Sequence, residues 1–319
     1  CNQHRISGQD REATEETVRE AIRQAEKLVT GDKKPQLAFY GGSFTAIPEE
    51  YQNSLLLAAK DALDRGSISA IRLSTRPDAI DGSILCRLKT YGVETIELGA
   101  QSLCNDVLRL SGRGHTAENV RESARMIKEA GFHLILQMMT GLPGDTPERS
   151  IDTAKEMIAL KPDGVRIYPT VVVRDTALFD LWKIGKYKEH TVEEAVSLCA
   201  QLVPLFEAAG IPIIRLGLNP TAELSAGYAA AGAYHPALGE LVHCRIFRNK
   251  TELLLKENGT EPGSRIQLEV APDRLSQMVG QHRENIRYLQ DRFELSSVKV
   301  KSNSAYQGNE IGFSVEKTD

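Results

Sequence analysis

Five short polar or glycine-containing sequences point to a shared ligand site. Each follows an apolar run, and they are GGSFT (41–45), STRPD (74–78), GAQS (99–102), TGLPG (140–144) and YPT (168–170). Glycine lets a ligand approach the backbone and exposes amide donors, while Arg, Gln and Ser side chains bind polar ligand groups. Each sequence also has a purely structural reading: Gly41 and Gly42 suit a tight turn, and Arg76 beside Asp78 suits a local ion pair. Their recurrence after successive apolar runs predicts one ligand site.

The elements that must position these sequences alternate between strands and helices. Strands are expected near residues 37, 71, 95, 134, 165 and 213, and helices over residues 14–29, 48–65, 79–91, 146–160 and 192–209. Short β-branched strands joined by helices predict a parallel sheet with the helices outside. Barrel enzymes place their chemistry at the carboxyl ends of the strands, where the five sequences fall. We therefore predict an α/β fold with a partial or complete TIM-type (β/α) barrel, and a doubly wound open sheet is the alternative.

Composition narrows the class of protein. The 319 residues carry 39 Lys and Arg against 43 Asp and Glu, so the net charge of −4 gives no overall attraction to nucleic acid or to an anionic membrane. The longest apolar runs, such as residues 134–139, are far shorter than the roughly 20 residues of a membrane span, so no membrane partner is expected. The five cysteines are Cys1, Cys86, Cys104, Cys199 and Cys244. An odd number at wide spacing argues against a disulfide framework and favours the cytoplasm, with the last four cysteines buried.

The chain beyond residue 220 has a different pattern, which predicts a barrel over residues 1–220 and a smaller α+β domain over residues 221–319. The alanine-rich residues 222–233 are expected to be helical, and residues 243–245 to precede a polar turn. Strands are expected at 265–270, 298–301 and 311–315, and helices at 273–279 and 284–293. This order, with a turn at residues 280–283, resembles a KH module, whose GxxG loop clamps the RNA backbone. Arg283 replaces the second glycine, so the clamp is degenerate.

Six segments together resemble the radical S-adenosylmethionine (SAM) domain of the Elongator catalytic subunit and its bacterial relatives. They are GGSFT (41–45), STRPDAI (74–80), IELGAQS (96–102), SGRGHT (111–116), HLILQMMTGLPG (133–144) and RIYPTVVVRDTALFDLWKIGKYKEHT (166–191). The resemblance covers about residues 1–216, and a weaker one continues to Cys244, Arg245 and Arg248. It implies a radical SAM barrel with two cofactors, a 4Fe–4S cluster and SAM.

The resemblance also implies which residues hold the cofactors. Three cysteines spaced CxxxCxxC bind three irons of such a cluster and leave the fourth iron for SAM. Cys1 is similar to the last of these cysteines, so we expect the other two to lie upstream and this stretch alone to be clusterless and inactive. Ser43 stands where many radical SAM proteins have a glutamate. The residues implied to bind SAM are Gly41, Gly42, Ser43, Thr75, Arg76, Gln101, Ser102, Gln137, Met139 and Arg166.

The activity that the resemblance implies is reductive cleavage of SAM to a 5′-deoxyadenosyl radical, with an electron donor as a further partner and tRNA or another RNA as the substrate. No catalytic side chain is assigned. Lys183, Lys186 and Lys188 alternate with Trp182 and Tyr187, a combination that suits stacking and phosphate contact. Arg283 and Arg287 are further candidates for RNA contact. The alternative is a non-catalytic RNA-binding or assembly protein with an inherited barrel.

Overall fold

The computed structural model describes residues 12–29, 34–221 and 224–316, and the chain divides into two compact units. The first unit comprises the described residues up to Thr191 together with Pro204–Tyr234. The second comprises Val192–Val203 and the described residues from His235 onward. The predicted border at residue 220 thus falls within the last stretch of the first unit, and the division into a barrel and a C-terminal domain remains a proposal.

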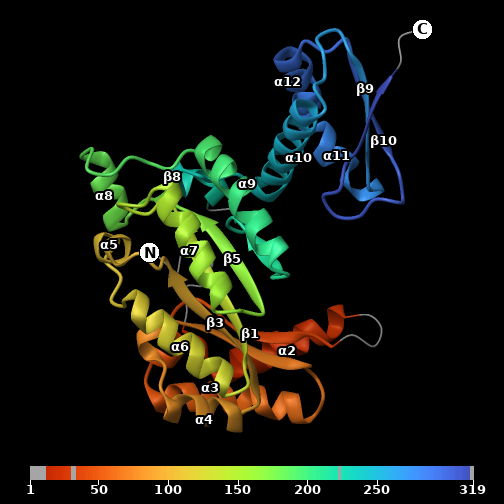
Figure 1. Cartoon of the computed structure of the whole chain (residues 1–319). Helices are drawn as coiled ribbons and strands as arrows, with labels where there is room; N and C mark the ends of the chain where they lie inside the picture. Colours follow the sequence, from red (N-terminus) through yellow and green to blue (C-terminus); the bar gives the residue numbers. More distant parts are fainter. Residues whose placement is uncertain (1–11, 30–33, 222–223, 317–319) are drawn as a thin grey trace. The chain divides into compact units, whose positions relative to one another are not determined.

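The first unit is built on a curled sheet of six parallel strands (Figure 1). Its strands, in spatial order, are β1 (Gln36–Phe39), β2 (Ala70–Thr75), β3 (Val93–Gln101), β4 (His133–Thr140), β5 (Gly164–Pro169) and β7 (Ile213–Leu216). The spatial order follows the chain order, with no reversal at a switch point. A doubly wound sheet requires such a reversal, whereas a barrel does not. The predicted partial TIM-type barrel is therefore confirmed, and the doubly wound alternative is wrong.

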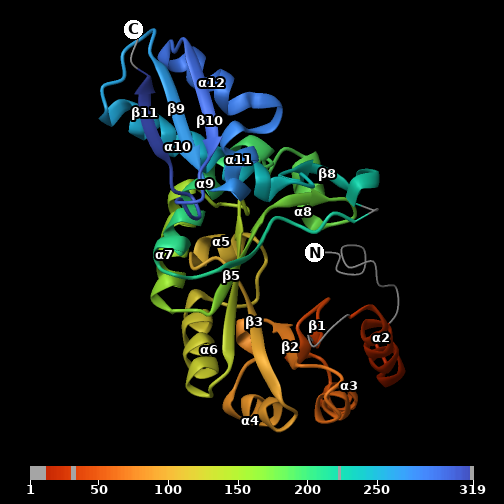
Figure 2. The ribbon, with the colours of Figure 1, turned by 90° about the vertical axis from the view of Figure 1, so that its right-hand side faces the viewer.

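Helices between the strands cover the outer face of the sheet, as Figure 2 shows for α4 and α6. Threonine caps the start of several of them: Thr14, Thr116 and Thr146 each accept a hydrogen bond from an amide of the first turn. Such caps satisfy amides that have no partner inside the helix. The helices of this unit are α2 (Glu15–Leu28), α3 (Glu49–Asp64), α4 (Gly82–Thr90), α5 (Asn105–Leu110), α6 (Ala117–Glu129) and α7 (Pro147–Ala159), with 3₁₀ turns η1 (Phe44–Ala46) and η2 (Pro77–Ala79). The residues of α9 (Val192–Ala208) are divided between the two units.

The two faces of the sheet differ in chemistry. The helix-covered face carries fully buried aliphatic side chains, namely Ile71, Leu73, Ile96, Leu98, Leu134, Leu136, Val165 and Ile167. Side chains alternate between faces along a strand, so the residues in between point to the inner face of the curl. Those residues include Arg72, Glu97, Gln137 and Arg166. The inner face is therefore polar although its strands lie inside the fold.

The connection after β5 is more regular than expected. It contains β6 (Val171–Val173) and α8 (Ala177–Lys183), and neither was among the elements expected from the sequence. The expected helix over residues 222–233 is also wrong for its described part. That part forms one π-helical turn, η3 (Leu224–Tyr228), and then β8 (Ala229–Gly232), which pairs antiparallel with β6. Alanine favours a helix locally, but Gly227 adopts a φ of +98°, which breaks the helix.

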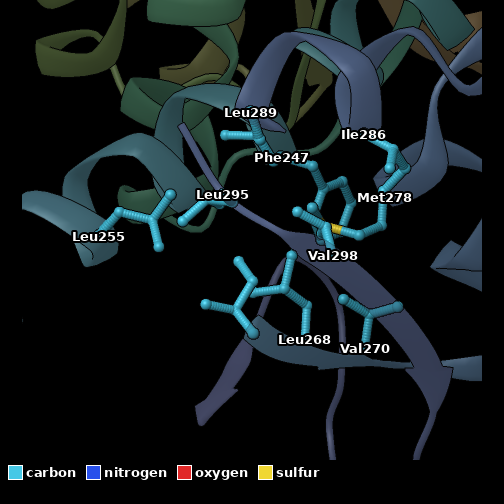
Figure 3. Packing of buried hydrophobic residues seen from close by; sticks show 10 residues of the cluster. Phe247, Leu255, Leu268, Val270, Met278, Ile286, Leu289, Leu295 and Val298 are labelled. Atoms are coloured by element: carbon cyan, nitrogen blue, oxygen red, sulfur yellow. The ribbon is translucent and has the colours of Figure 1, made fainter. Parts of the chain in front are cut away.

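The second unit packs helices on one face of a three-stranded sheet with the order β10-β9-β11. β9 runs parallel to β10 and antiparallel to β11. Figure 3 shows its core, in which Phe247, Leu268, Met278 and Leu289 meet. The elements are α10 (Leu238–Glu257), β9 (Arg265–Val270), η4 (Pro272–Arg274), α11 (Leu275–Val279), η5 (Gln281–Arg283), α12 (Glu284–Phe293), β10 (Ser297–Ser302) and β11 (Gly312–Glu316).

The element order predicted from residue 265 onward is confirmed, and the likeness to a KH module remains a prediction. Residues 243–245, however, lie inside α10 instead of preceding a turn. This helix was missed because its apolar residues are spread around it: Leu253 is exposed, whereas Val242 and Phe247 are buried. An apolar stripe with helical spacing is the usual sequence signal for a helix.

The predicted burial of the last four cysteines is confirmed for two of them only. Cys199 and Cys244 are buried, but Cys86 is exposed and Cys104 is only partly covered, so the expected burial is wrong for these two. Cys86 lies on α4 beside Leu85 and Leu88, which face the sheet and leave Cys86 on the outer side of the helix. All four are free thiols.

Among the described helices, none combines the length and apolarity that a membrane crossing requires.

Candidate active site

A buried carboxylate organises the inner face of the sheet. Glu97, in the middle of β3, is only 4% exposed. Its Oε1 lies 3.0 Å from Nε of Arg72 on β2, and its Oε2 lies 2.8 Å from Nε of Arg166 on β5. The hydroxyl of Tyr40, which directly follows β1, donates a hydrogen bond to Glu97 and accepts one from Nη2 of Arg166 at 3.0 Å. Four side chains from distant parts of the sequence thus form one network.

The network carries more positive than negative charge. Burial of Tyr40 and its hydrogen bond to Glu97 raise the pKa of the phenol to about 12, so Tyr40 is neutral at physiological pH. Burial alone would lower the pKa of Arg166, but the hydrogen bond and ion pair with Glu97 raise it, and the guanidinium stays charged. Two guanidinium groups therefore surround one carboxylate. Such a network is stable only while every buried charge keeps its partner.

Sequence reasoning singled out Arg166 but missed Tyr40, Arg72 and Glu97. A signal was present, since Arg72 and Glu97 each interrupt a run of aliphatic residues in a strand expected to be buried. Charged residues are almost never fully buried unless they are paired. A charge at the centre of a buried strand therefore indicates a partner on a neighbouring strand, although it does not identify that partner.

The turn after β1 leaves its backbone open to a ligand. Gly41 adopts a φ of +104°. Apart from the chain neighbours, no atom of the described residues lies within 4 Å of the position that a Cβ would take on Gly41 or Gly42. The hydroxyl of Ser74 supports the turn by donating to the carbonyl of Gly42 at 3.2 Å. Ser43 is partly exposed and begins the 3₁₀ turn η1. This geometry fits the predicted role of the turn in binding the amino group of SAM.

The loop after β2 is held by its own hydrogen bonds and by an ion pair. The hydroxyl of Thr75 is buried 2.5 Å from that of Thr45, which also donates to the carbonyl of Ala79. Arg76 pairs with Asp78, with Nε and Oδ1 2.9 Å apart, and its side chain is about half exposed. The local ion pair considered from the sequence therefore forms. Neither contact assigns these two residues to a ligand, so their part in binding SAM remains a prediction.

Gln101 and Gln137 meet on the inner face, and Ser102 does not join them. Nε2 of Gln137 donates to Oε1 of Gln101 at 3.1 Å. Gln101 adopts a φ of +66°. A Cβ on Gly99 would lie 2.8 Å from Nε2 of Gln101, so glycine at position 99 gives this amide its room. The hydroxyl of Ser102 instead lies 3.3 Å from that of Thr153 on α7 and accepts from the amide of Cys104.

Arg113 has an unusual environment. Its Nη2 lies 3.5 Å from Sδ of Met139, and none of the acidic side chains in the described ranges is within ion-pair distance of it. Burial lowers the pKa of this guanidinium, with no counterion to oppose the shift. A desolvated charge without a partner is costly, so such a group suits an anionic ligand. Arg113 belongs to the segment SGRGHT but received no role from the sequence.

Cys1, the predicted cluster ligand, lies outside the described residues. Within residues 12–29, 34–221 and 224–316, no three His, Cys, Asp or Glu side chains form a group that could hold a metal ion. The described residues thus fit SAM, through an open glycine turn and a guanidinium free for a carboxylate. They provide no cluster ligands of their own.

Comparison with known proteins agrees with this topology. Residues 1–157 match the family described as "Radical SAM superfamily", and residues 162–248 match the "Radical_SAM C-terminal domain". The chain belongs to the radical SAM superfamily. The first of these matches ends within α7, and the second runs from just before β5 into α10.

Several relatives of this radical SAM chain are Elongator proteins. It is 34% identical over 249 residues to Elongator complex protein 3 of Homo sapiens, covering 72% of this chain and 45% of that protein. It is 33% identical over 249 residues to the Drosophila melanogaster protein, covering 72% and 44%. A solved structure of the archaeal Methanocaldococcus infernus Elp3 with an N-terminus deletion is similar at TM-score 0.63 and 25% identity, covering 78% of this chain and 65% of that one. The chain spans less than half the length of the curated relatives it matches.

The lysines proposed for RNA contact in this radical SAM chain lie on or after α8. Lys183 and Arg174 approach the ring of Phe179, at 5.5 and 5.8 Å from its centroid, and Trp182 packs beside it at 5.9 Å. Lys183, Lys186 and Lys188 are exposed. Tyr187, by contrast, is buried and donates to the carbonyl of Gly141 at 2.6 Å. The aromatic partner of Lys183 is thus Phe179, which the sequence did not single out.

In the second unit, Arg283 and Arg287 flank the turn at residues 280–283. Arg283 adopts a left-handed conformation with a φ of +64°, and so does His282 at +50°. Arg287 donates from Nη2 to the carbonyl of His282 at 2.8 Å. Arg283 thus holds a left-handed conformation of the kind that favours glycine. The RNA contact of both arginines remains a prediction.

Proposed function

We propose that this chain is the core of a radical SAM enzyme that cleaves SAM reductively and acts on an RNA, with tRNA as the first candidate. The observation that supports this best is the combination of the open turn at Gly41 and Gly42 with the unpaired guanidinium of Arg113, on a chain of the radical SAM superfamily. SAM carries an amino group and a carboxylate on one carbon. The carbonyl oxygens of the turn can accept hydrogen bonds from the amino group, and the guanidinium can donate to the carboxylate.

In this proposal each residue has a limited task. The backbone of Gly41 and Gly42 binds the amino group, Arg113 holds the carboxylate, and the amides of Gln101 and Gln137 bind polar groups of the nucleoside. When bound, SAM and a reduced 4Fe–4S cluster supply a 5′-deoxyadenosyl radical. The protein orients the reacting groups and excludes water around them. Cys1 is the proposed cluster ligand of this chain, and an electron donor is the further partner that the reaction requires.

RNA as the substrate is supported by two features. The segments that resemble the Elongator family include residues 166–191, and these residues carry the Phe179 patch: the half-buried Phe179 and Trp182 with the exposed Arg174 and Lys183. An aromatic ring bordered by cations offers both base stacking and phosphate contact. The net charge of −4 is no obstacle, because such a patch acts locally.

The test uses the full-length protein that contains this chain, purified without oxygen and reconstituted with iron and sulfide. We expect an absorption and electron paramagnetic resonance spectrum of a 4Fe–4S cluster, and release of 5′-deoxyadenosine from SAM on reduction. Transfer of tritium from a labelled tRNA into 5′-deoxyadenosine would identify the substrate. A protein with a full cluster that leaves SAM intact would contradict the proposal. If that protein still bound tRNA, it would support the non-catalytic alternative.

A further inference from the structure

Two arginines lie next to each other on α10, in the second unit. Arg245 and Arg248 are three positions apart, so their side chains leave the helix on the same side. Only 11% and 12% of these side chains are exposed. Burial lowers the pKa of the Arg248 guanidinium, and the positive charge of Arg245 lowers it further. Two like charges held together in this way require negative charge nearby.

Two glutamates supply this negative charge unequally. Glu193 on α9 accepts two hydrogen bonds from Nη2 of Arg245, at 2.6 and 2.8 Å. By contrast, Oε1 of Glu284 on α12 lies 3.7 Å from Nη1 of Arg248, which is too long for a hydrogen bond. The Glu284 side chain is 61% exposed, and an exposed ion pair of this kind contributes little to stability. Arg248 is therefore only weakly paired.

An aromatic ring holds the guanidinium of Arg248 in place. The guanidinium carbon lies 4.3 Å from the centroid of the half-buried Tyr288 ring on α12. Stacking of this kind leaves the N–H groups at the edge of the guanidinium free to donate. Nε of Arg248 is buried and has no hydrogen-bond partner among the residues that the structure describes. Buried donors nearly always have an acceptor, so this arginine suits an acceptor that a ligand provides.

We propose that Arg245 and Arg248 form a binding site for one phosphate group, with Tyr288 orienting Arg248. The site goes beyond the proposed function, because it lies in the second unit and requires neither SAM nor the cluster. Arginine suits this ligand, since its planar set of N–H groups matches phosphate oxygens in pairs. The phosphate oxygens accept hydrogen bonds from both guanidinium groups, while Glu284 turns outward into solvent. A phosphodiester of RNA and a free phosphate share this chemistry, and the test separates them.

The test titrates the full-length protein with inorganic phosphate, followed by phosphorus nuclear magnetic resonance, and with labelled tRNA, followed by fluorescence anisotropy. We expect Arg248→Gln to weaken binding about 10- to 150-fold, the range for a lost hydrogen bond to a charged group. Glu284→Gln should instead tighten binding, because it removes the carboxylate that competes with the ligand. Arg292→Gln is the matched control for the loss of one positive charge, since Arg292 is exposed near the end of α12.

The two titrations identify the source of the phosphate. A loss in Arg248→Gln for tRNA, with or without a loss for inorganic phosphate, assigns the site to the RNA backbone. A loss for inorganic phosphate alone assigns it to a free phosphate compound. Binding of neither probe, or equal affinities in the wild type, Arg248→Gln and Glu284→Gln, would overturn the proposal. Circular dichroism shows whether Arg248→Gln folds, and the gain expected in Glu284→Gln tests the site with both arginines in place.

Discussion

At the scale of single residues, the inner face is defined by charges that could not lie there alone. Glu97 is buried in a strand whose other residues are largely aliphatic, and each of its oxygens faces a guanidinium. Removing one partner of such a group leaves an uncompensated buried charge, which costs more than the pair itself contributes. The charges on β2, β3 and β5 therefore depend on one another. We interpret the network as part of the site and not as part of the core.

Arg113 gives a direct test of the proposed cofactor contact. Replacing it with alanine should weaken SAM binding by about 1–3 kcal/mol, the range for a lost hydrogen bond to a charged group. Isothermal titration calorimetry of the full-length protein measures this change. Arg109→Ala is the matched control, because Arg109 is exposed and already paired with Asp106. Equal SAM affinity in the Arg113 variant and the wild type would place the carboxylate elsewhere.

His115 gives a prediction about pH. It is buried, its Nε2 lies 3.0 Å from the carbonyl of Ala100, and burial lowers its pKa. A group whose pKa is lower in the folded state binds protons better when unfolded, so it destabilises the fold as pH falls below its ordinary value of about 6.5. We expect His115→Gln to flatten the fall in the unfolding midpoint between neutral and mildly acidic pH. Parallel pH curves for variant and wild type would argue against this role.

At the scale of elements, one amide joins three helices of the second unit. Nδ2 of the buried Asn285 on α12 donates to the carbonyls of Cys244 on α10 and of Gln277 and Met278 on α11, at 2.8, 3.1 and 3.2 Å. A Cβ on Gly280 would lie 3.0 Å from the backbone nitrogen of Asn285, so the turn at residues 280–283 packs closely against this residue. The side-chain amide therefore holds the three helices together at this turn.

Replacing Asn285 with alanine should lower the free energy of unfolding by about 1–3 kcal/mol, because three buried carbonyls lose a donor. Urea denaturation followed by circular dichroism measures the change. Arg292→Ala on the exposed side of α12 is the control and should shift the midpoint little. An unchanged midpoint for Asn285→Ala would mean that water replaces the lost donor.

At the scale of the whole molecule, the proposed RNA contact can be assigned to one of the two units by its salt dependence. Each lysine or arginine on a phosphate of single-stranded RNA adds roughly 0.7 to the slope of log affinity against log salt concentration. We expect tRNA binding by the full-length protein to weaken with salt. The double variant Lys183→Ala/Lys186→Ala should reduce the slope by about 1.4 if both lysines contact phosphates.

The double variant Arg283→Ala/Arg287→Ala is the matched comparison for the second unit. A smaller slope in this variant alone would assign the contact to the KH-like turn and not to α8. A slope that neither variant changes would exclude all four residues from phosphate contact. Affinity that does not depend on salt would argue against an RNA substrate altogether.

The sequence by itself determined the strand–helix alternation, the parallel sheet, the glycine turn after β1 and membership of the family. These features depend on local periodicity and on short motifs, which one chain segment carries by itself. It did not determine the partners of Glu97, the isolation of Arg113 or the cations around the ring of Phe179. Tyr40 and Arg166 are 126 positions apart in the chain, and only the curl of the sheet brings them together. The alanine-rich segment shows the same limit, because its pairing with β6 overrides a local preference for helix.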